Sequence, residues 1–228
     1  MTKQIIAVVC PTVRPAAMIF MAESAQNHAT NPMIVAALDK DESKRNLFGT
    51  NHAVFTATGN GIVRVLNEAV KHVLDAGYDW VLFVGDDCRF MTDGWDEKLL
   101  AAVPEDGIGV VYPAHWPGKD GAENECFAYH FMLSRKWLET VGYMAYPGFD
   151  GLHYGLDTWV IKVGRELKRM FPVKDVLVQH FHYQRGGVLD EVYKRNEANA
   201  NKAGRVYYGK ECQDEIKRMV EKLRGEMK

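Results

Sequence analysis

The stretch that decides the fold is Val81-Leu82-Phe83-Val84-Gly85-Asp86-Asp87-Cys88. Its apolar run is typical of a strand buried on both faces, and it leads directly into two adjacent carboxylates. In an open α/β sheet the ligand crevice lies outside the carboxyl ends of the strands, so we expect Asp86 and Asp87 at that crevice. Neighbouring carboxylates repel each other, and a divalent cation or protonation relieves the repulsion. The stretch therefore predicts a cation site, with plain turn formation as the alternative.

Two earlier segments, Ile5–Cys10 and Met33–Leu38, have the same continuous apolar character. Between Met33–Leu38 and Val81–Cys88, apolar side chains recur at helical spacing over Ile62–Leu74. Gly77 is expected to end this helix. Buried strands that alternate with amphipathic helices are typical of an α/β domain with a largely parallel sheet.

The second half of the chain is more irregular. Strands are expected over Ile108–Tyr112, Phe127–Ser134 and Val173–Tyr183, and a helix over Thr158–Arg169. The intervening stretch Val141–Leu156 is rich in glycine and aromatic residues, which predicts a functional loop.

The last segment, Glu211–Met227, is charged and carries an apolar stripe at helical spacing. We expect residues 1–205 to form one domain and residues 206–228 to form a helical tail. The apolar stripe of that tail would pack on the domain itself or on the second subunit of a homodimer.

Composition narrows the class of protein. The chain has 228 residues, 47% of them hydrophobic and 25% charged, which excludes a disordered or fibrous chain. A formal net charge of −2 argues against a protein dominated by nucleic-acid electrostatics, although a local basic groove stays open. The four cysteines are scattered without a CxxC pair, which favours a reducing cytoplasm. No apolar run is long enough for a membrane span.

Chemically useful side chains follow the other predicted strands. Cys10-Pro11-Thr12-Val13-Arg14-Pro15 brings a hydroxyl and a guanidinium group to the end of the first strand. Asp39 follows the second strand, and its carboxylate could accept the N–H groups of uracil or guanine. The late strand carries His180 and His182, which alternation places on one face. A single strand histidine is usually structural, but two beside a carboxylate site are candidate metal ligands, and either could bind.

The order of these motifs resembles glycosyltransferases of the GT-A fold, closest to the family-2-like group, over roughly residues 4–195. The resemblance implies a single GT-A-like α/β domain, with a Rossmann-like, mostly parallel central sheet flanked by helices and a C-terminal amphipathic helix. It puts Gly85-Asp86-Asp87 in the place of the DxD motif, which binds a Mn²⁺ or Mg²⁺ ion that holds the donor diphosphate. The sequence departs from that motif, because Gly85 replaces the first acid.

The resemblance also implies roles for individual residues. Asp87 would bind the metal directly, and Asp86 would lie nearer the ribose or a metal-bound water. The nucleotide-sugar would lie against the first two strand ends, at Pro11, Thr12, Arg14 and Asp39.

Asp157, in His153-Tyr154-Gly155-Leu156-Asp157-Thr158-Trp159, fits the slot where inverting members of the group carry an acid at a helix start. It would take the proton from an acceptor hydroxyl. The alternative is that Asp157 is simply the N-cap of the helix, whose dipole would lower its pKa and weaken it as a base.

Three further residues are candidates for contact with the nucleotide-sugar. Asn60, in Gly59-Asn60-Gly61, precedes a helix as in a phosphate-binding turn, but the P-loop lysine is missing. Arg64 on that helix would reach the crevice or lie on its solvated face. Arg185, followed by two glycines, could close over phosphates, and the loop around Trp116 could provide an aromatic platform.

Together these features predict a metal-dependent, inverting transfer of a sugar from a nucleoside-diphosphate sugar, with UDP expected, to an acceptor hydroxyl. The acceptor could be a glycan, a small molecule or a hydroxylated base in phage-type DNA. One alternative is a sugar-nucleotide nucleotidyltransferase, but such an enzyme should have a glycine-rich loop after its first strand, where Pro11–Pro15 has no glycine. A non-catalytic nucleotide- or glycan-binding module is the other alternative.

Overall fold

A computed structural model describes residues 6–30, 32–40, 52–115, 128–152, 155–183 and 187–227. Within these ranges, strands form one sheet with the order β3-β2-β1-β4-β7-β6-β8-β5. The strands are β1 (Ile6–Pro11), β2 (Met33–Leu38), β3 (Ala53–Thr56), β4 (Trp80–Phe83), β5 (Cys88–Phe90), β6 (Val110–His115), β7 (Phe131–Ser134) and β8 (Met170–His180). The helices are α1 (Pro15–Asn27), α2 (Ile62–Asp75), α3 (Trp95–Ala101), α4 (Arg135–Val141), α5 (Leu156–Leu167), α6 (Glu191–Tyr208) and α7 (Lys210–Glu226).

The sheet is mostly parallel, as predicted. Strands β3, β2, β1 and β4 are parallel neighbours, and so are β6 and β8. Strand β7 is antiparallel to both β4 and β6, and β5 is antiparallel to β8. The parallel register pairs Val9 of β1 with Val35 of β2 and Phe83 of β4. The carboxyl ends of these three strands therefore meet at one edge of the sheet.

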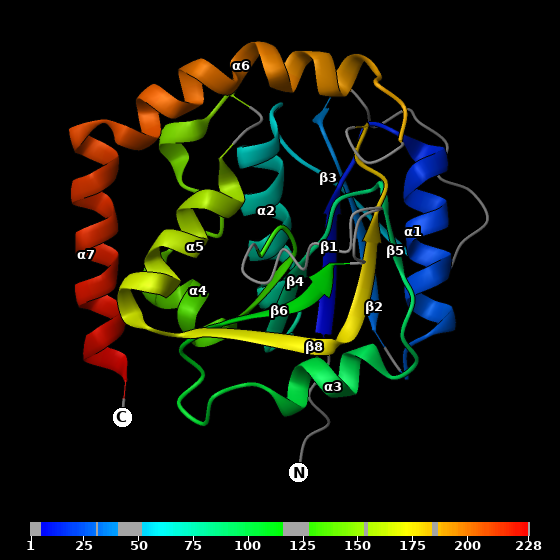
Figure 1. The fold of residues 1–228 in the computed structure, drawn as a ribbon, viewed down its shortest axis with the longest axis horizontal. Coiled ribbons are helices and arrows are strands. Elements are labelled where there is room, and N and C mark those ends of the chain that lie inside the picture. The colour runs from blue at the N-terminus through cyan, green and yellow to red at the C-terminus, as the bar shows by residue number, and fades with distance from the viewer. Residues whose placement is uncertain are drawn as a thin grey trace.

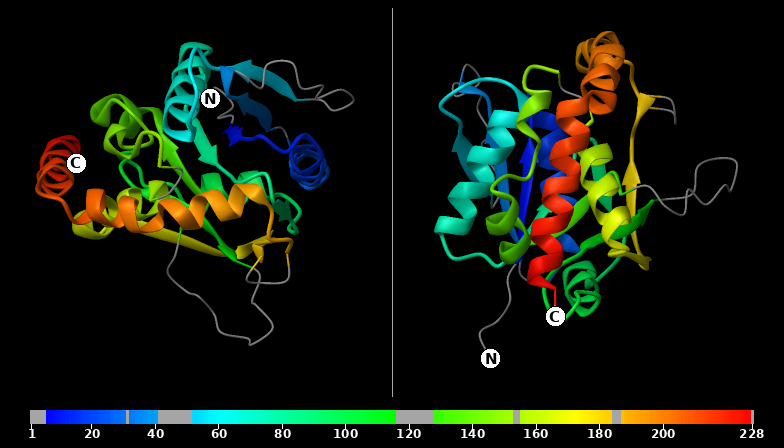
Figure 2. Two further views of the ribbon diagram at one scale, coloured as in Figure 1. Left: turned by 90° about the horizontal axis from the view of Figure 1, so that it is seen from above. Right: turned by 90° about the vertical axis from the view of Figure 1, so that its left-hand side faces the viewer.

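Helices cover both faces of the sheet (Figure 2). Along β1, Ala7 and Val9 pack into the core beneath α2, α4, α5 and α7. Ile6, Val8 and Cys10 pack into the core beneath α1 and α3. This alternation explains the continuous apolar run, because each residue from Ile6 to Cys10 is buried on one side or the other.

Helix α7 confirms the predicted C-terminal amphipathic helix. It buries Ile216, Met219, Val220 and Leu223, and it packs against α4, α5 and α6. Figure 1 shows α6 running across one end of the molecule before α7 descends along its side. The expected boundary between residues 205 and 206 falls inside α6. No helix in the described ranges is both long and apolar enough to span a membrane.

The glycine- and aromatic-rich stretch is irregular, as predicted, but part of it is buried. It contains a 3₁₀ turn, Pro147–Phe149, and buries Met144, Ala145, Phe149 and Leu152. These side chains join the core, and among the described residues of the stretch the pocket is lined by Gly155 and Leu156, at the start of α5.

Candidate active site

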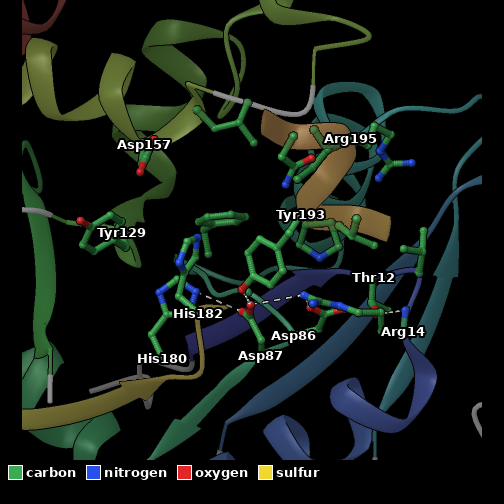
Figure 3. A pocket seen from close by; sticks show the side chains of 18 of the residues that line it. Thr12, Arg14, Asp86, Asp87, Tyr129, Asp157, His180, His182, Tyr193 and Arg195 are labelled. Atoms are coloured by element: carbon green, nitrogen blue, oxygen red, sulfur yellow. Dashed lines mark hydrogen bonds and ion pairs between the residues drawn. The ribbon is translucent and has the colours of Figure 1, made fainter. Parts of the chain in front are cut away.

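A pocket of about 540 Å³ lies at the carboxyl ends of β1, β2 and β4. The start of α5, the end of β8 and the first turns of α6 complete its walls. Figure 3 shows Asp157 and Tyr129 on one side and Thr12 and Arg14 on the other, with Asp87 between them. The predicted site residues that line the pocket are Pro11, Thr12, Arg14, Asp39, Asp86, Asp87, Asp157, His180 and His182.

Backbone hydrogen bonds hold the strand ends together. The Thr12 N–H donates to the carbonyl of Ala37 at 3.0 Å, which joins the ends of β1 and β2. Asp39 Oδ1 accepts the N–H of Gly61 at 3.0 Å, which fixes the carboxylate against the turn before α2. Asp39 thus has one oxygen committed to the backbone.

Asp86 is only 5% exposed and forms an ion pair with the partly buried Arg14. Its Oδ2 accepts hydrogen bonds from Thr12 Oγ1 at 2.6 Å and from Arg14 Nε at 3.1 Å, and its Oδ1 accepts Arg14 Nη2. Burial alone would lower the pKa of Arg14, but its hydrogen bond with Asp86 and the neighbouring carboxylates raise it. Arg14 therefore stays charged, and Asp86 fixes its orientation.

Asp87 is the central carboxylate of the pocket. Its Oδ1 lies 3.3 Å from Nε2 of His180, and its Oδ2 accepts the hydroxyl of Tyr193. Burial alone would raise the pKa of Asp87, but His180, Tyr193 and Arg14 together hold it well below the ordinary aspartate range. Asp87 is consequently ionised at neutral pH.

The geometry around Asp87 fits a divalent cation. Ligand atoms of Asp87, Cys88 and His180 all lie within 4.8 Å of one another. Two adjacent oxygen or nitrogen ligands of an octahedral ion are about 3 Å apart, close to the 3.3 Å between Asp87 Oδ1 and His180 Nε2. A Cβ on Gly85 would lie 2.8 Å from Asp87 Oδ1, so the glycine leaves room for this carboxylate.

Cys88 and His182 are weaker candidates for the cation site than Asp87 and His180. Cys88 is 1% exposed, and burial raises the pKa of its thiol well above the ordinary value, so it is protonated at neutral pH. The His182 ring lies 5.4 Å from that of His180, outside the group of converging ligand atoms in the described part of the chain. The arrangement favours Asp87 and His180 over His182.

Asp157 lines the pocket, but it is not the N-cap of α5. The helix begins at Leu156, and the cap position is Gly155 in the left-handed conformation, with φ of 90°. Asp157 Oδ1 instead accepts the N–H of Thr158 at 2.7 Å and its hydroxyl at 3.3 Å. Burial raises the pKa of Asp157 despite these hydrogen bonds. The alternative in which Asp157 is the N-cap with a lowered pKa is therefore wrong.

Three predicted residues are not seen in the pocket wall. Asn60 and Arg64 are exposed and lie outside the described lining. Helix α2 turns Ile62 and Val65 towards the pocket, while the Arg64 side chain packs over Gly59. Arg185, like the Trp116 loop, falls outside the described residues.

The sequence analysis did not predict helix α6 or the roles of Tyr193 and Asp190. Tyr193 reaches Asp87, and Asp190 Oδ2 accepts Arg14 Nη1 at 3.1 Å. A capping signal was present, because Asp190 accepts the N–H of Tyr193 at 3.0 Å and begins the helix. The helix lacks a clear apolar stripe, since only Tyr193 and Ala203 are buried in it.

No family model matches the chain, and no curated protein matches it in sequence. Several solved structures share its fold. TarS from Staphylococcus aureus superposes with a TM-score of 0.57 and 15% identity over 90% of this chain. Glucosyl-3-phosphoglycerate synthase from Mycobacterium tuberculosis, in complex with Mn²⁺, UDP and glucosyl-3-phosphoglycerate, superposes with a TM-score of 0.56 and 14% identity. That match covers 88% of this chain and 80% of the synthase.

A mannosyltransferase from Pyrobaculum calidifontis, in complex with GDP-Man and Mn²⁺, gives a TM-score of 0.53 and 12% identity. That match covers 97% of this chain and 73% of the mannosyltransferase. The chain spans 44% of the length of TarS. The fold is therefore the GT-A fold of nucleotide-sugar glycosyltransferases, as the order of motifs predicted.

Proposed function

We propose that the chain is a metal-dependent glycosyltransferase that moves a sugar from a nucleoside-diphosphate sugar to an acceptor hydroxyl. The observation that carries the proposal is the pair formed by Asp87 Oδ1 and His180 Nε2, 3.3 Å apart, in a pocket that also contains Asp157. Further support comes from structures of the same fold that hold UDP with Mn²⁺ or GDP-Man with Mn²⁺.

The charge of the pocket supports a need for metal. Its described lining residues include five carboxylates and two guanidinium groups, namely Asp39, Asp86, Asp87, Asp157, Glu197, Arg14 and Arg195. Arg14 is already paired with Asp86, Asp87 and Asp190. A diphosphate would enter a field with more negative than positive charge, so a divalent cation is the simplest compensation.

Each residue then has a defined task. Asp87 and His180 would hold the cation, which stabilises the negative charge of the departing nucleoside diphosphate. Asp39 keeps Oδ1 on the backbone N–H of Gly61 and offers Oδ2 to an N–H group of the base. We expect UDP, because the N3–H of uracil matches a single acceptor oxygen.

Asp157 is the proposed base. Its Oδ1 accepts the Thr158 hydrogen bonds, and we assign Oδ2 to the acceptor hydroxyl. A raised pKa brings a carboxylate closer to the pH at which general bases work best. A base that activates the acceptor for direct attack on the anomeric carbon gives inversion.

The test is release of nucleoside diphosphate from a panel of UDP- and GDP-sugars with Mn²⁺. We expect release by the wild-type chain to stop in EDTA and to fall at least 100-fold in Asp87→Asn, which weakens the cation site. The matched control is Asp93→Asn, because the side chain of Asp93 is 91% exposed and pairs with His28. Release that survives both EDTA and Asp87→Asn would contradict the proposal.

A further inference from the structure

Tyr193 is one of two buried residues of a largely solvated helix. It is 7% exposed, and its ring lies 4.6 Å from that of His182 and 5.0 Å from that of Tyr183, centre to centre. The guanidinium carbon of Arg14 lies 5.5 Å from the centre of the ring. These ring contacts explain how α6 docks on the domain, but they do not require a hydroxyl.

The Tyr193 hydroxyl has a separate partner, because it donates to Oδ2 of Asp87. Arg14 Nη2 lies 3.4 Å from the same oxygen. The other oxygen, Oδ1, is the one that faces His180 Nε2. Tyr193 and Arg14 therefore flank Oδ2, while Oδ1 faces His180 Nε2 and accepts a long hydrogen bond from the Cys88 thiol at 3.8 Å.

The turn that carries Tyr193 is fixed by Asp190. Asp190 Oδ1 accepts the N–H of Tyr193 at 3.0 Å, and its Oδ2 accepts Arg14 Nη1 at 3.1 Å. One side chain thus caps α6 and joins it to the arginine beside Asp87. The hydroxyl of Tyr193 is delivered from a capped helix, which keeps it in a defined position.

We propose that Tyr193 is a positioning residue for the cation site: its hydroxyl occupies Oδ2 of Asp87, so that Oδ1 binds the cation together with His180. This inference rests on the proposed metal-dependent function. Without the hydroxyl, Oδ2 of Asp87 loses its closest described donor and keeps Arg14 Nη2 at 3.4 Å, so the carboxylate is oriented less firmly. Partners that orient a ligand side chain typically change metal affinity 10- to 100-fold.

The test measures Mn²⁺ binding directly, by the loss of the electron paramagnetic resonance signal of free Mn²⁺ during titration. Wild type, Tyr193→Phe and Tyr208→Phe are titrated alone and with saturating UDP or GDP. Phenylalanine keeps the ring contacts of Tyr193. Tyr208 is the matched control, because it ends the same helix and is 80% exposed. Thermal unfolding in EDTA reports any damage to the fold that does not involve metal.

We expect Tyr193→Phe to weaken Mn²⁺ binding about tenfold while Tyr208→Phe leaves it unchanged. Equal Mn²⁺ affinity in Tyr193→Phe and wild type would overturn this inference and leave the proposed function intact. A wild-type chain that binds no Mn²⁺ with either nucleotide would overturn both. If Tyr193→Phe unfolds in EDTA, Asp190→Ala gives a second test, because it removes the cap that holds the turn carrying Tyr193 and so loosens the hydroxyl from Asp87. In that case, wild-type affinity in Asp190→Ala would overturn the inference.

Discussion

Asp86 and Asp87 are neighbours in sequence with different surroundings. Asp86 accepts hydrogen bonds from Thr12 and Arg14, and Asp87 faces His180 and Tyr193. The sequence placed both at a strand end and favoured Asp87 as the metal ligand. It could not show that Asp86 pairs with Arg14, because such a pairing depends on side-chain directions at the ends of two separate strands.

Asp157 gives a prediction at the scale of one residue. We expect Asp157→Asn to reduce the rate of sugar transfer about 10²- to 10⁴-fold while Mn²⁺ and nucleotide binding stay near wild type, because the base is lost and the donor site is kept. Transfer rate and calorimetric binding of UDP with Mn²⁺ are measured on the same preparation. Transfer at the wild-type rate would rule out Asp157 as the base.

The pH profile follows from the same residue. A base acts only when it is deprotonated, and burial raises the pKa of Asp157. The transfer rate should therefore fall as the pH drops through a pKa above the ordinary aspartate value, and this acidic limb should be absent from the residual rate of Asp157→Asn. An unchanged acidic limb in the variant would assign that pKa to another group.

At the scale of elements, the junction between α4 and α5 depends on one side chain of α2. Asn67 Oδ1 accepts the N–H groups of Met144 at 3.0 Å and Ala145 at 2.8 Å, and its Nδ2 donates to the carbonyl of Ala145 at 2.8 Å. Met144 and Ala145 are fully buried or nearly so. The amide of Asn67 thus supplies the hydrogen bonds that this irregular buried segment cannot make within itself.

Replacement of that side chain tests the role of the junction. We expect Asn67→Ala to lower the free energy of unfolding by about 2–3 kcal/mol, because buried backbone groups lose their partners. The control Asn201→Ala replaces an exposed asparagine within α6 and should change the free energy of unfolding by no more than about 0.5 kcal/mol. Urea denaturation of the two variants gives the comparison. A similar, small change in both would show that the segment does not depend on Asn67.

Local patterns predicted some elements better than others. Strands such as β1 and β2 were predictable, because both faces are buried and the apolar run is continuous. Helix α5 begins two residues earlier than expected, since Gly155, in the left-handed conformation, takes the cap position that the alternative interpretation gave to Asp157. Helix α6 was missed because it has almost no buried face, and β5 because it has only three residues.

At the scale of the whole molecule, the fold follows from the alternation of buried strands and amphipathic helices, together with polar residues at successive strand ends. The antiparallel insertion of β7 between β4 and β6 was not predicted, because a short apolar run has the same sequence pattern in a parallel and in an antiparallel strand. The contact between Asp87 and Tyr193 joins residues 106 positions apart, so only the folded chain reveals it.

The central claim is that Asp87 and His180 together hold a divalent cation that binds a nucleoside diphosphate. Crystals grown with Mn²⁺ and UDP test it most directly, by anomalous diffraction that locates the manganese. We predict a peak about 2.2 Å from both Asp87 Oδ1 and His180 Nε2, with the diphosphate on its open side. Nucleotide bound in the pocket without manganese beside these two atoms would contradict the claim.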